Sequence, residues 1–448
     1  MRKLRPILIA LLMASPLVAP GFTALAGSAT WKTAPTDGLW NNTNNWAPAT
    51  VPQGSDTATF GTSSITSISE TLGLSSIGAY QFNAGASAYT ITYFPGASFA
   101  INGTGVTNSS GVLQNFVLPT TSTGDTIVSF LNGATAGDLT QWTVSGSTDS
   151  NHGAQIVFAN TSKAANTTLI ANSGTGLPGA ILFTESATGD SASVTLNGGL
   201  LDISGHDSTG MTLGSLEGSG PVFLGSHRLT VGRNRANTTY TGLIQDGGMS
   251  GGTGGSFAKV GLGTLTITNA NTYTGDTSVN GGTFTVANTT GSATGTGPVQ
   301  VNAGILGGKG TIAGAVNVGA DTPDRPHLAP ASGTQTPATL TIQSSLTFQP
   351  TGGYNWSVRA KGRRSQSDRV NANGVTILSG ASFTILSQVQ GTLTVGTVFT
   401  VISNTSAMPI SGTFSNLANG AVITIGSNNL QANYSGGDGN DLTLTVVP

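Results

Sequence analysis

The chain has 448 residues, a formal net charge of −2 and no cysteine, which excludes a disulfide scaffold, a thiolate metal site, a cysteine nucleophile and a lipoprotein anchor. Only 8% of the residues are charged, against about 25% in an ordinary globular domain. Since the charge balance is not basic, a nucleic-acid-binding face is not expected. The 65 glycines and the 37% hydrophobic content favour stacked short strands over disorder.

Residues 1–26 have the pattern of a secretory signal peptide. An apolar run from residue 7 to 14 precedes Ala24-Leu25-Ala26, which matches a small-residue cleavage site, and the charged head consists of Arg2, Lys3 and Arg5. The apolar run is too short to span a bilayer. We therefore expect a secreted chain with no membrane span and, once the three basic residues of the head are removed, a net charge of about −5.

Three tryptophans, Trp31, Trp40 and Trp46, lie close together near the predicted start of the secreted chain. Bulky aromatic side chains can fill a cap over the first coil of a solenoid. Exposed tryptophans between polar residues can instead stack on sugar rings. We favour the cap and keep the sugar site as the alternative.

Residues 61–255 contain short apolar runs at irregular spacing, such as Tyr89 to Tyr93 and Thr126 to Phe130. They predict either the same solenoid as the later residues, with longer loops, or a separate β-sandwich. The run from Gly247 to Gly255 consists mainly of glycine, serine and threonine, so we expect a flexible loop that leaves one coil.

Residues 259–318 show the clearest repeat. Apolar residues alternate at 264–267, 283–286, 299–301 and 316–318, which is the period of strands with one buried face. An apolar-Asn-any-Gly step starts at Leu196, Val279, Val301 and Val316, and the last three starts are 22 and 15 residues apart. Glycine permits sharp corners and stacked asparagines can hydrogen-bond to one another. The spacing predicts coils of a parallel β-solenoid; the alternative is a sandwich with Asn-Gly hairpins.

Three segments of this stretch also resemble a known family. They are Lys-Val-Gly-Leu-Gly-Thr-Leu-Thr-Ile from Lys259, Asn-Thr-Tyr-Thr-Gly from Asn271 and Val-Asn-Gly-Gly-Thr-Phe-Thr-Val from Val279. They are similar to the autotransporter-associated β-strand repeat of bacterial surface proteins, as are segments from Gly214, Gly412 and Tyr434. The resemblance implies a secreted, right-handed parallel β-helix at the cell surface and implies no catalytic residues. Because the chain ends at Pro448 without the strands of a membrane barrel, we expect a passenger-like protein without that barrel.

Residues 320–338 are rich in proline, so we expect a loop or a break between coils. The segment 354–361 predicts a strand that points Tyr354, Trp356 and Val358 to one side. A basic cluster follows within and after this strand; it consists of Arg359, Lys361, Arg363, Arg364 and Arg369, with Asp368 beside it. These side chains are a candidate anion-binding patch for acidic polysaccharide or lipopolysaccharide. The alternative, which we favour, is a solvated strand end and loop that prevent edge pairing.

Two further groups of residues have the composition of candidate sites. Asp202, His206 and Asp207 could form an acid/base or metal trio, but paired carboxylates or a placed base are missing from the pattern, so a polar turn is favoured. The run Gly-Gly-Asp-Gly-Asn-Asp-Leu from Gly436 is similar to one copy of a calcium-binding nonapeptide. That motif binds calcium when several copies stack, so we expect a tight turn instead. The sequence predicts no catalytic residue, no metal and no cofactor.

Together these patterns predict an all-β protein, a right-handed parallel β-helix with an N-terminal cap and a C-terminal cap. The expected organisation is a signal peptide (1–26), a cap with irregular coils (27–160), the solenoid (161–349, with the repeat at 259–318) and a closing β region (350–448). The expected function is that of a secreted, non-enzymatic structural or adhesin-like protein in the outer envelope of a bacterium. The alternative is a polysaccharide-binding or polysaccharide-degrading protein on the same scaffold.

Overall fold

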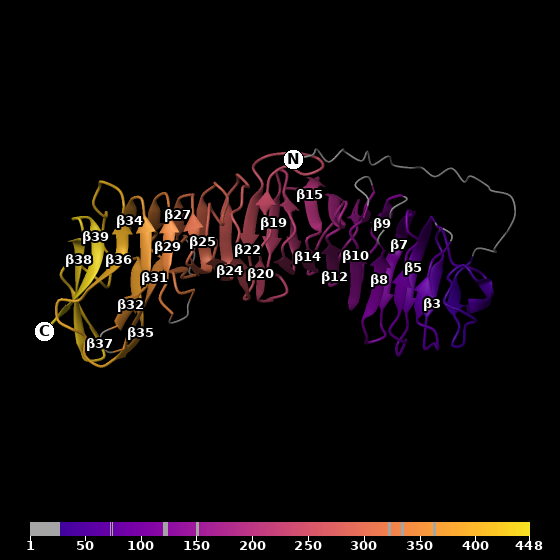
Figure 1. Ribbon diagram of the computed structural model, residues 1–448, viewed down its shortest axis with the longest axis horizontal. Coiled ribbons are helices and arrows are strands. Elements are labelled where there is room, and N and C mark those ends of the chain that lie inside the picture. The colour runs from indigo at the N-terminus through magenta and orange to yellow at the C-terminus, as the bar shows by residue number, and fades with distance from the viewer. Residues whose placement is uncertain are drawn as a thin grey trace. The chain divides into compact units, whose positions relative to one another are not determined.

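The computed structural model describes residues 27–71, 73, 75–119, 124–148, 152–320, 324–332, 336–361 and 364–448; the predicted signal peptide lies outside this range. Two compact units are formed, and in each the strands lie side by side in ladders (Figure 1). Unit 1 contains the described residues up to Gly214 together with Ser219–His227 and Gly247–Gly252. Unit 2 contains Ser215–Gly218, Arg228–Asp246 and the described residues from Thr253 to Pro448.

Unit 1 is built from two sheets. The first has the strand order β2 (Trp46–Ala47), β1 (Ala29–Trp31), β3 (Thr57–Phe60), β5 (Ser76–Phe82), β7 (Ser98–Asn108), β9 (Thr126–Phe130), β11 (Ala154–Phe158), β13 (Ala180–Glu185), β15 (Leu200–His206) and β18 (Val222–Phe223). The second contains β4 (Ser67–Ser69), β6 (Thr90–Thr92), β8 (Gln114–Leu118), β10 (Thr140–Val144), β12 (Thr168–Asn172), β14 (Ser193–Asn197) and β16 (Gly210–Leu213).

The pairing within these sheets shows that the N-terminal half is a solenoid. From β1 to β18 each strand pairs in parallel with its neighbour in the first sheet, and β4 to β14 do the same in the second. Because the chain alternates between the two sheets, each turn stacks on the one before. The β-sandwich alternative is therefore wrong for these residues, and the ladder continues through residue 160, where a domain boundary was predicted.

Unit 2 is also a stack of parallel strands. One sheet contains β19 (Arg228–Val231), β22 (Ser256–Lys259), β24 (Thr277–Val286), β25 (Val299–Gly308), β27 (Val316–Val318), β30 (Leu346–Phe348) and β34 (Val375–Ile377). A second contains β17 (Ser215–Gly218), β20 (Thr238–Tyr240), β23 (Thr264–Ile267), the later halves of β24 and β25, β28 (His327–Ala329), β31 (Gly353–Lys361) and β35 (Ser382–Gln390). The repeat thus forms parallel rungs rather than antiparallel hairpins, as predicted.

The third sheet of unit 2 changes direction near the end of the chain. Its order is β26 (Thr311–Ile312), β29 (Thr339–Ile342), β33 (Arg369–Ala372), β36 (Val398–Asn404), β39 (Asp441–Val447), β38 (Asn428–Gly436) and β37 (Val422–Ile425). The pairs up to β36 are parallel, and those from β36 to β37 are antiparallel. The remaining strands are β21 (Ile244–Gln245) and β32 (Arg364–Ser367).

Inward side chains stack on their equivalents in the next rung. Phe130, Phe158 and Phe183 form one such column, with ring centroids 4.9 Å and 4.7 Å apart and planes nearly parallel. Phe116 stacks on Trp142 at 4.0 Å in the opposite sheet. Because these side chains are fully buried, they supply apolar burial that short strands need for stability.

Asparagine pairs confirm part of the predicted repeat. Asn302 donates from Nδ2 to Asn280 Oδ1 at 2.8 Å across 22 residues, and Asn197 donates to Asn172 Oδ1 at 3.1 Å across 25 residues. The predicted 15-residue step to Asn317 is wrong: Val301 pairs with Val318, so Asn317 lies beside Gln300.

Two expectations about loops are corrected. The proline-rich stretch 320–338 contains the strand β28, which pairs with β25 and β31. The Gly247–Gly252 segment is held to the coil rather than free, because Met249 and Ser250 donate their backbone N–H groups to side chains of β15. Across the residues that the structure describes, no helix is both long enough and apolar enough to cross a membrane.

Candidate functional site

Lys259 is the most unusual side chain of the repeat because it points into the core. It occupies β22 in the same column as Val231, Val279 and Val301, which pair with it or with each other in parallel register. Only 1% of its surface is exposed, and the three valines are equally buried. A lysine at an inward position must find polar partners for its ammonium group.

Backbone carbonyl groups at the corners of two rungs supply those partners. Lys259 Nζ donates to Val260 O at 2.7 Å, to Gly261 O at 3.2 Å and to Gly281 O at 3.3 Å. The first two oxygens belong to the corner that follows β22, and the third lies in the corner within β24. The ammonium group therefore joins two successive turns of the solenoid. We call these three carbonyl groups the lysine cage.

Glycines make room for the cage. Gly282 has a φ of +62°, and a Cβ added to it would lie 2.8 Å from Lys259 Nζ. Gly232, in the preceding rung, has a φ of +126°, and a Cβ there would lie 3.3 Å from the same atom. Any larger residue would meet both a strained backbone and the ammonium group. Lys259 and the Gly281-Gly282 pair of the repeat thus form one structural feature.

Burial sets the electrostatics of the cage. It lowers the pKa of Lys259 from 10.5 to about 8, because the charged form loses hydration. The partners of the ammonium group are neutral carbonyl dipoles, which favour the charged form without supplying a full negative charge. This arrangement suits a side chain that holds two successive turns of the solenoid together.

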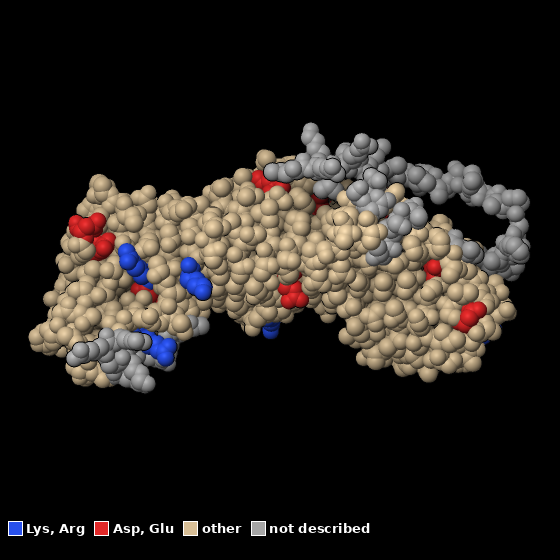
Figure 2. Space-filling model, in the orientation of Figure 1, with Lys and Arg blue, Asp and Glu red and all other residues tan. Residues whose placement is uncertain are grey.

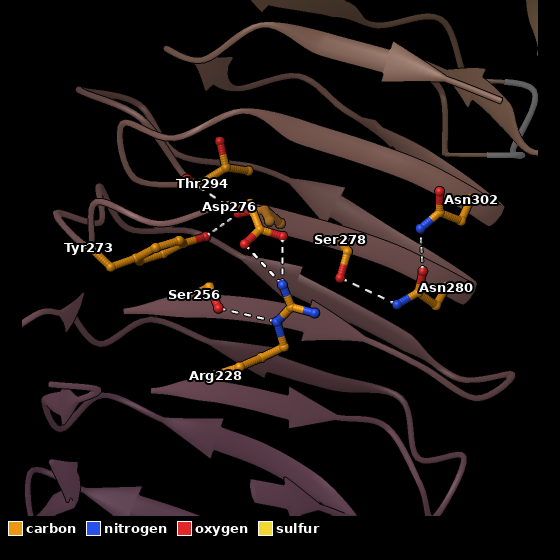
Figure 3. A network of polar contacts seen from close by, with 9 residues as sticks. Arg228, Ser256, Tyr273, Asp276, Ser278, Asn280, Thr294 and Asn302 are labelled. Carbon is orange, nitrogen blue, oxygen red and sulfur yellow. Dashed lines mark hydrogen bonds and ion pairs between the residues drawn. The ribbon is translucent and has the colours of Figure 1, made fainter. Parts of the chain in front are cut away.

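An outer network joins the same rungs on the solvent side (Figure 3). Arg228 Nη2 contacts both carboxylate oxygens of Asp276, at 3.0 Å and 2.9 Å, and Arg228 Nε donates to Ser256 Oγ at 3.1 Å. The two charged side chains are 45% and 40% exposed, so the ion pair contributes little to stability. Its geometry nevertheless links β19, β22 and the start of β24.

A buried hydroxyl chain closes the corner behind this network (Figure 3). Tyr273 Oη lies 2.6 Å from Thr277 Oγ1. Thr277 Oγ1 donates to Thr294 O at 3.3 Å, so the tyrosine is the donor of the shorter bond. Burial raises the pKa of Tyr273 well above its ordinary value, and the hydroxyl group keeps its proton.

The candidate anion-binding patch is described only in part. Arg359 and Arg369 are exposed, whereas Arg363 and the side chains of Lys361 and Arg364 lie outside the described residues. At Arg359, β31 pairs with β32 on one side and with β35 on the other. Arg359 therefore does not lie at a free edge of β31, and both anion binding and the protection of a strand edge by this cluster stay predictions.

Asp368 does not belong to this surface, because its side chain is fully buried. Its carboxylate accepts from the backbone N–H groups of Ala338 at 2.8 Å and Ser357 at 2.9 Å. Burial raises the pKa of Asp368 above its ordinary value, and these hydrogen bonds oppose the rise. The carboxylate connects β31 to the segment that leads into β29.

Asp202 and His206 are bound to the backbone. Asp202 accepts from Ser204 N at 2.8 Å and from Met249 N at 2.7 Å. His206 Nε2 lies 2.7 Å from Ala187 O, and since a carbonyl group only accepts, Nε2 carries the proton. His206 Nδ1 accepts from Ser208 N at 3.2 Å. Asp207 is exposed. These contacts agree with the polar turn that the sequence favoured.

The tryptophans are unavailable to sugars. All five are less than 2% exposed. Trp46 packs edge-on against Trp31 at 5.0 Å and against Trp40 at 4.9 Å, and the three indole nitrogens donate to backbone carbonyl groups. The sugar-stacking alternative for these residues is wrong, because their faces are covered by protein.

The glycine-rich run near the C-terminus is the turn between β38 and β39, as expected; Gly436 pairs with Asp441. Asp441 Oδ1 accepts from Asn404 N at 2.9 Å, which ties this turn to β36. A carboxylate oxygen can also bind a calcium ion, but Asp441 Oδ1 accepts a hydrogen bond from the backbone of Asn404 instead.

The lysine cage and the buried Asp368 were not predicted from the sequence. The spacing did contain one indication, since Lys259 stands two residues after Phe257 and at the inward phase of its strand. An ionisable residue at that phase predicts a buried polar contact.

Comparison with known proteins locates a family repeat at the cage. Among curated proteins, none matches the chain. Residues 257–286 match the family model described as the passenger-associated-transport-repeat. This match begins in β22 and ends with β24, so it contains Lys259, both corners that bind it and the Gly281-Gly282 pair. The resemblance to autotransporter passenger repeats is thereby confirmed for this segment, and the chain carries a passenger-associated-transport-repeat on a parallel β-solenoid.

Proposed function

We propose that the chain is a secreted, non-enzymatic β-solenoid with a structural or adhesin-like role at the surface of a bacterial cell. One observation carries the proposal: the buried ionisable groups hold one coil to the next. Lys259 binds carbonyl groups of two rungs, and Asp202 and Asp368 bind backbone N–H groups of neighbouring segments. These side chains are used for stacking.

The passenger-type repeat at 257–286 supports a location outside the cell. In a solenoid, every added rung buries its apolar side chains on the previous rung, so the fold extends without needing a central cofactor or a catalytic cleft. Charged side chains appear only in isolated places on the face in Figure 2. A sparsely charged outer surface suits contact with a neutral surface or with other envelope polymers.

The location is tested in the organism that makes the protein. Intact cells are treated with protease, the cells are fractionated, and an antibody against the chain follows its fate. We expect the protein in the envelope or the medium and its cleavage on intact cells. Protection from protease on intact cells, together with recovery from the cytoplasm, would contradict the proposal.

The non-enzymatic role is tested by a screen on polysaccharides with the wild-type chain, Asp202→Ala and Asp207→Ala. We expect no release of reducing ends by any of the three proteins. A wild-type activity that either substitution abolishes would instead support the polysaccharide-degrading alternative. For the anion patch, Arg359→Ala with Arg369→Ala should weaken retention on a heparin column only if these exposed side chains bind anionic polymers.

A further inference from the structure

The outward face of the second sheet of unit 1 carries two columns of uncharged side chains, which we call the hydroxyl lattice. One column runs from Ser67 to Ser193 through threonine and amide residues. The other consists of Ser69, Thr92, Val117, Thr143, Ile170 and Thr195. The positions of both columns are exposed or partly exposed. Five residues of the second column are β-branched.

The lattice is regular in two directions. The pairings from β4 to β14 contain no shift of register, whereas the first sheet has shifts between β5 and β7 and between β13 and β15. Neighbouring strands lie about 4.8 Å apart, and alternate residues of one strand are about 6.6 Å apart. β-Branched side chains have few χ1 rotamers, so their hydroxyl and methyl groups are fixed before any ligand arrives.

A periodic, uncharged surface of this kind fits a periodic, uncharged partner. We propose that the hydroxyl lattice binds the surface of ice crystals. Its two spacings lie near repeat distances of the oxygen lattice of hexagonal ice, so ordered water can continue from the hydroxyl groups into the crystal. The methyl groups between them favour an ordered hydration layer, and no charge along the columns disturbs it.

An insoluble neutral polysaccharide is the competing partner. Sugar rings are bound largely through aromatic faces, and the two aromatic side chains on the lattice strands, Phe116 and Trp142, are directed into the core and fully buried. The lattice presents threonine, valine and isoleucine in their place. The side-chain composition therefore favours ice.

The experiment measures inhibition of ice recrystallisation and thermal hysteresis by the purified chain. Thr143→Lys and Thr92→Lys each place a long charged side chain in the lattice. Thr347→Lys is the matched control, because Thr347 also faces outward, between buried Leu346 and Phe348 in β30 of unit 2. Circular dichroism confirms that each variant keeps its β-structure, and having lattice variants in two different rungs guards against one that fails to fold.

We expect the wild-type chain and Thr347→Lys to keep ice crystals small and both lattice variants to lose this activity. A wild-type chain no more active than albumin at equal concentration would overturn the proposal. Activity retained by both lattice variants, or lost in Thr347→Lys as well, would overturn the assignment to this face. Co-sedimentation with crystalline cellulose, without any effect on ice, would show that this face binds polysaccharide instead of ice.

Discussion

Replacing Lys259 by methionine tests whether the cage stabilises the repeat. Methionine retains an unbranched apolar stem and removes the ammonium group, so three carbonyl oxygens lose a donor. The bond at 2.7 Å is strong, and those at 3.2 Å and 3.3 Å are weaker. A hydrogen bond to a charged group contributes about 1.5–3 kcal/mol, and removal of a buried charge offsets part of the loss. Because the lowered pKa shows that burial opposes the charged form, we expect Lys259→Met to lower the free energy of unfolding by only about 1 kcal/mol at pH 7.

The assay is urea unfolding followed by far-UV circular dichroism, with hydrogen exchange to locate the effect. Lys309→Met is the matched control, because Lys309 is exposed in the same unit and surface substitutions change stability by less than about 0.5 kcal/mol. Equal urea midpoints of unfolding for wild type and Lys259→Met would show that the cage carbonyl groups find other partners. The claim that the cage stabilises the repeat would then be wrong.

The pH dependence gives a second check with a definite sign. The pKa of Lys259 is about 8 in the folded chain and 10.5 in the reference state. Between these values the unfolded chain binds more protons than the folded one, so the free energy of unfolding rises with pH. The difference in stability between wild type and Lys259→Met should therefore grow from pH 8 to pH 10.5. A flat difference over this range would contradict the lowered pKa.

Three other substitutions test the remaining contacts. Trp46→Ala should cost about 3–5 kcal/mol in urea unfolding followed by fluorescence, because Trp46 is fully buried; Leu262→Ala, at a position that is 73% exposed, should change little. Asp202→Ala should speed protease cleavage at 247–252, since it removes the acceptor of Met249 N, whereas Asp207→Ala should leave the cleavage rate unchanged. Asn302→Ala should lower the free energy of unfolding by about 1 kcal/mol or less, because the hydrogen bond that it removes is solvent-exposed.

Alternation and the Asn-Gly corners were sufficient to predict the parallel rungs. Leu265, Phe284 and Leu306 repeat the same inward phase, and the structure pairs them in adjacent rungs. The predicted pairing of Val301 with Val316 is wrong because the number of residues in a corner varies between turns. Two Asn-x-Gly corners lie next to each other only if the same number of residues separates each of them from the preceding strand. The local sequence determines which side chains of a strand face inward, but it does not determine the register in which the next strand pairs with it.

The candidate sites were harder to predict, because their side chains act across rungs. Asp202 reaches a segment 47 residues later, and Asp368 reaches one 30 residues earlier. No motif spacing encodes such contacts, since they depend on which loops the stacking brings together. The tryptophans show the same limit in part: the sequence favoured their burial in a cap, but the contacts of Trp46 with Trp31 and Trp40 come from the pairing of the first strands, which no spacing encodes.

The lysine cage also explains how a chain with few charges can keep one in its core. Glycine corners leave carbonyl groups near the interior, and an ammonium group that binds two successive corners exchanges hydration for hydrogen bonds within the stack. Because each rung of a solenoid contacts mainly its neighbours, loss of the cage should act locally. In Lys259→Met, hydrogen exchange should accelerate between Val231 and Val301 and stay unchanged in β8 to β12; acceleration throughout the chain would show that the solenoid unfolds as a single unit instead.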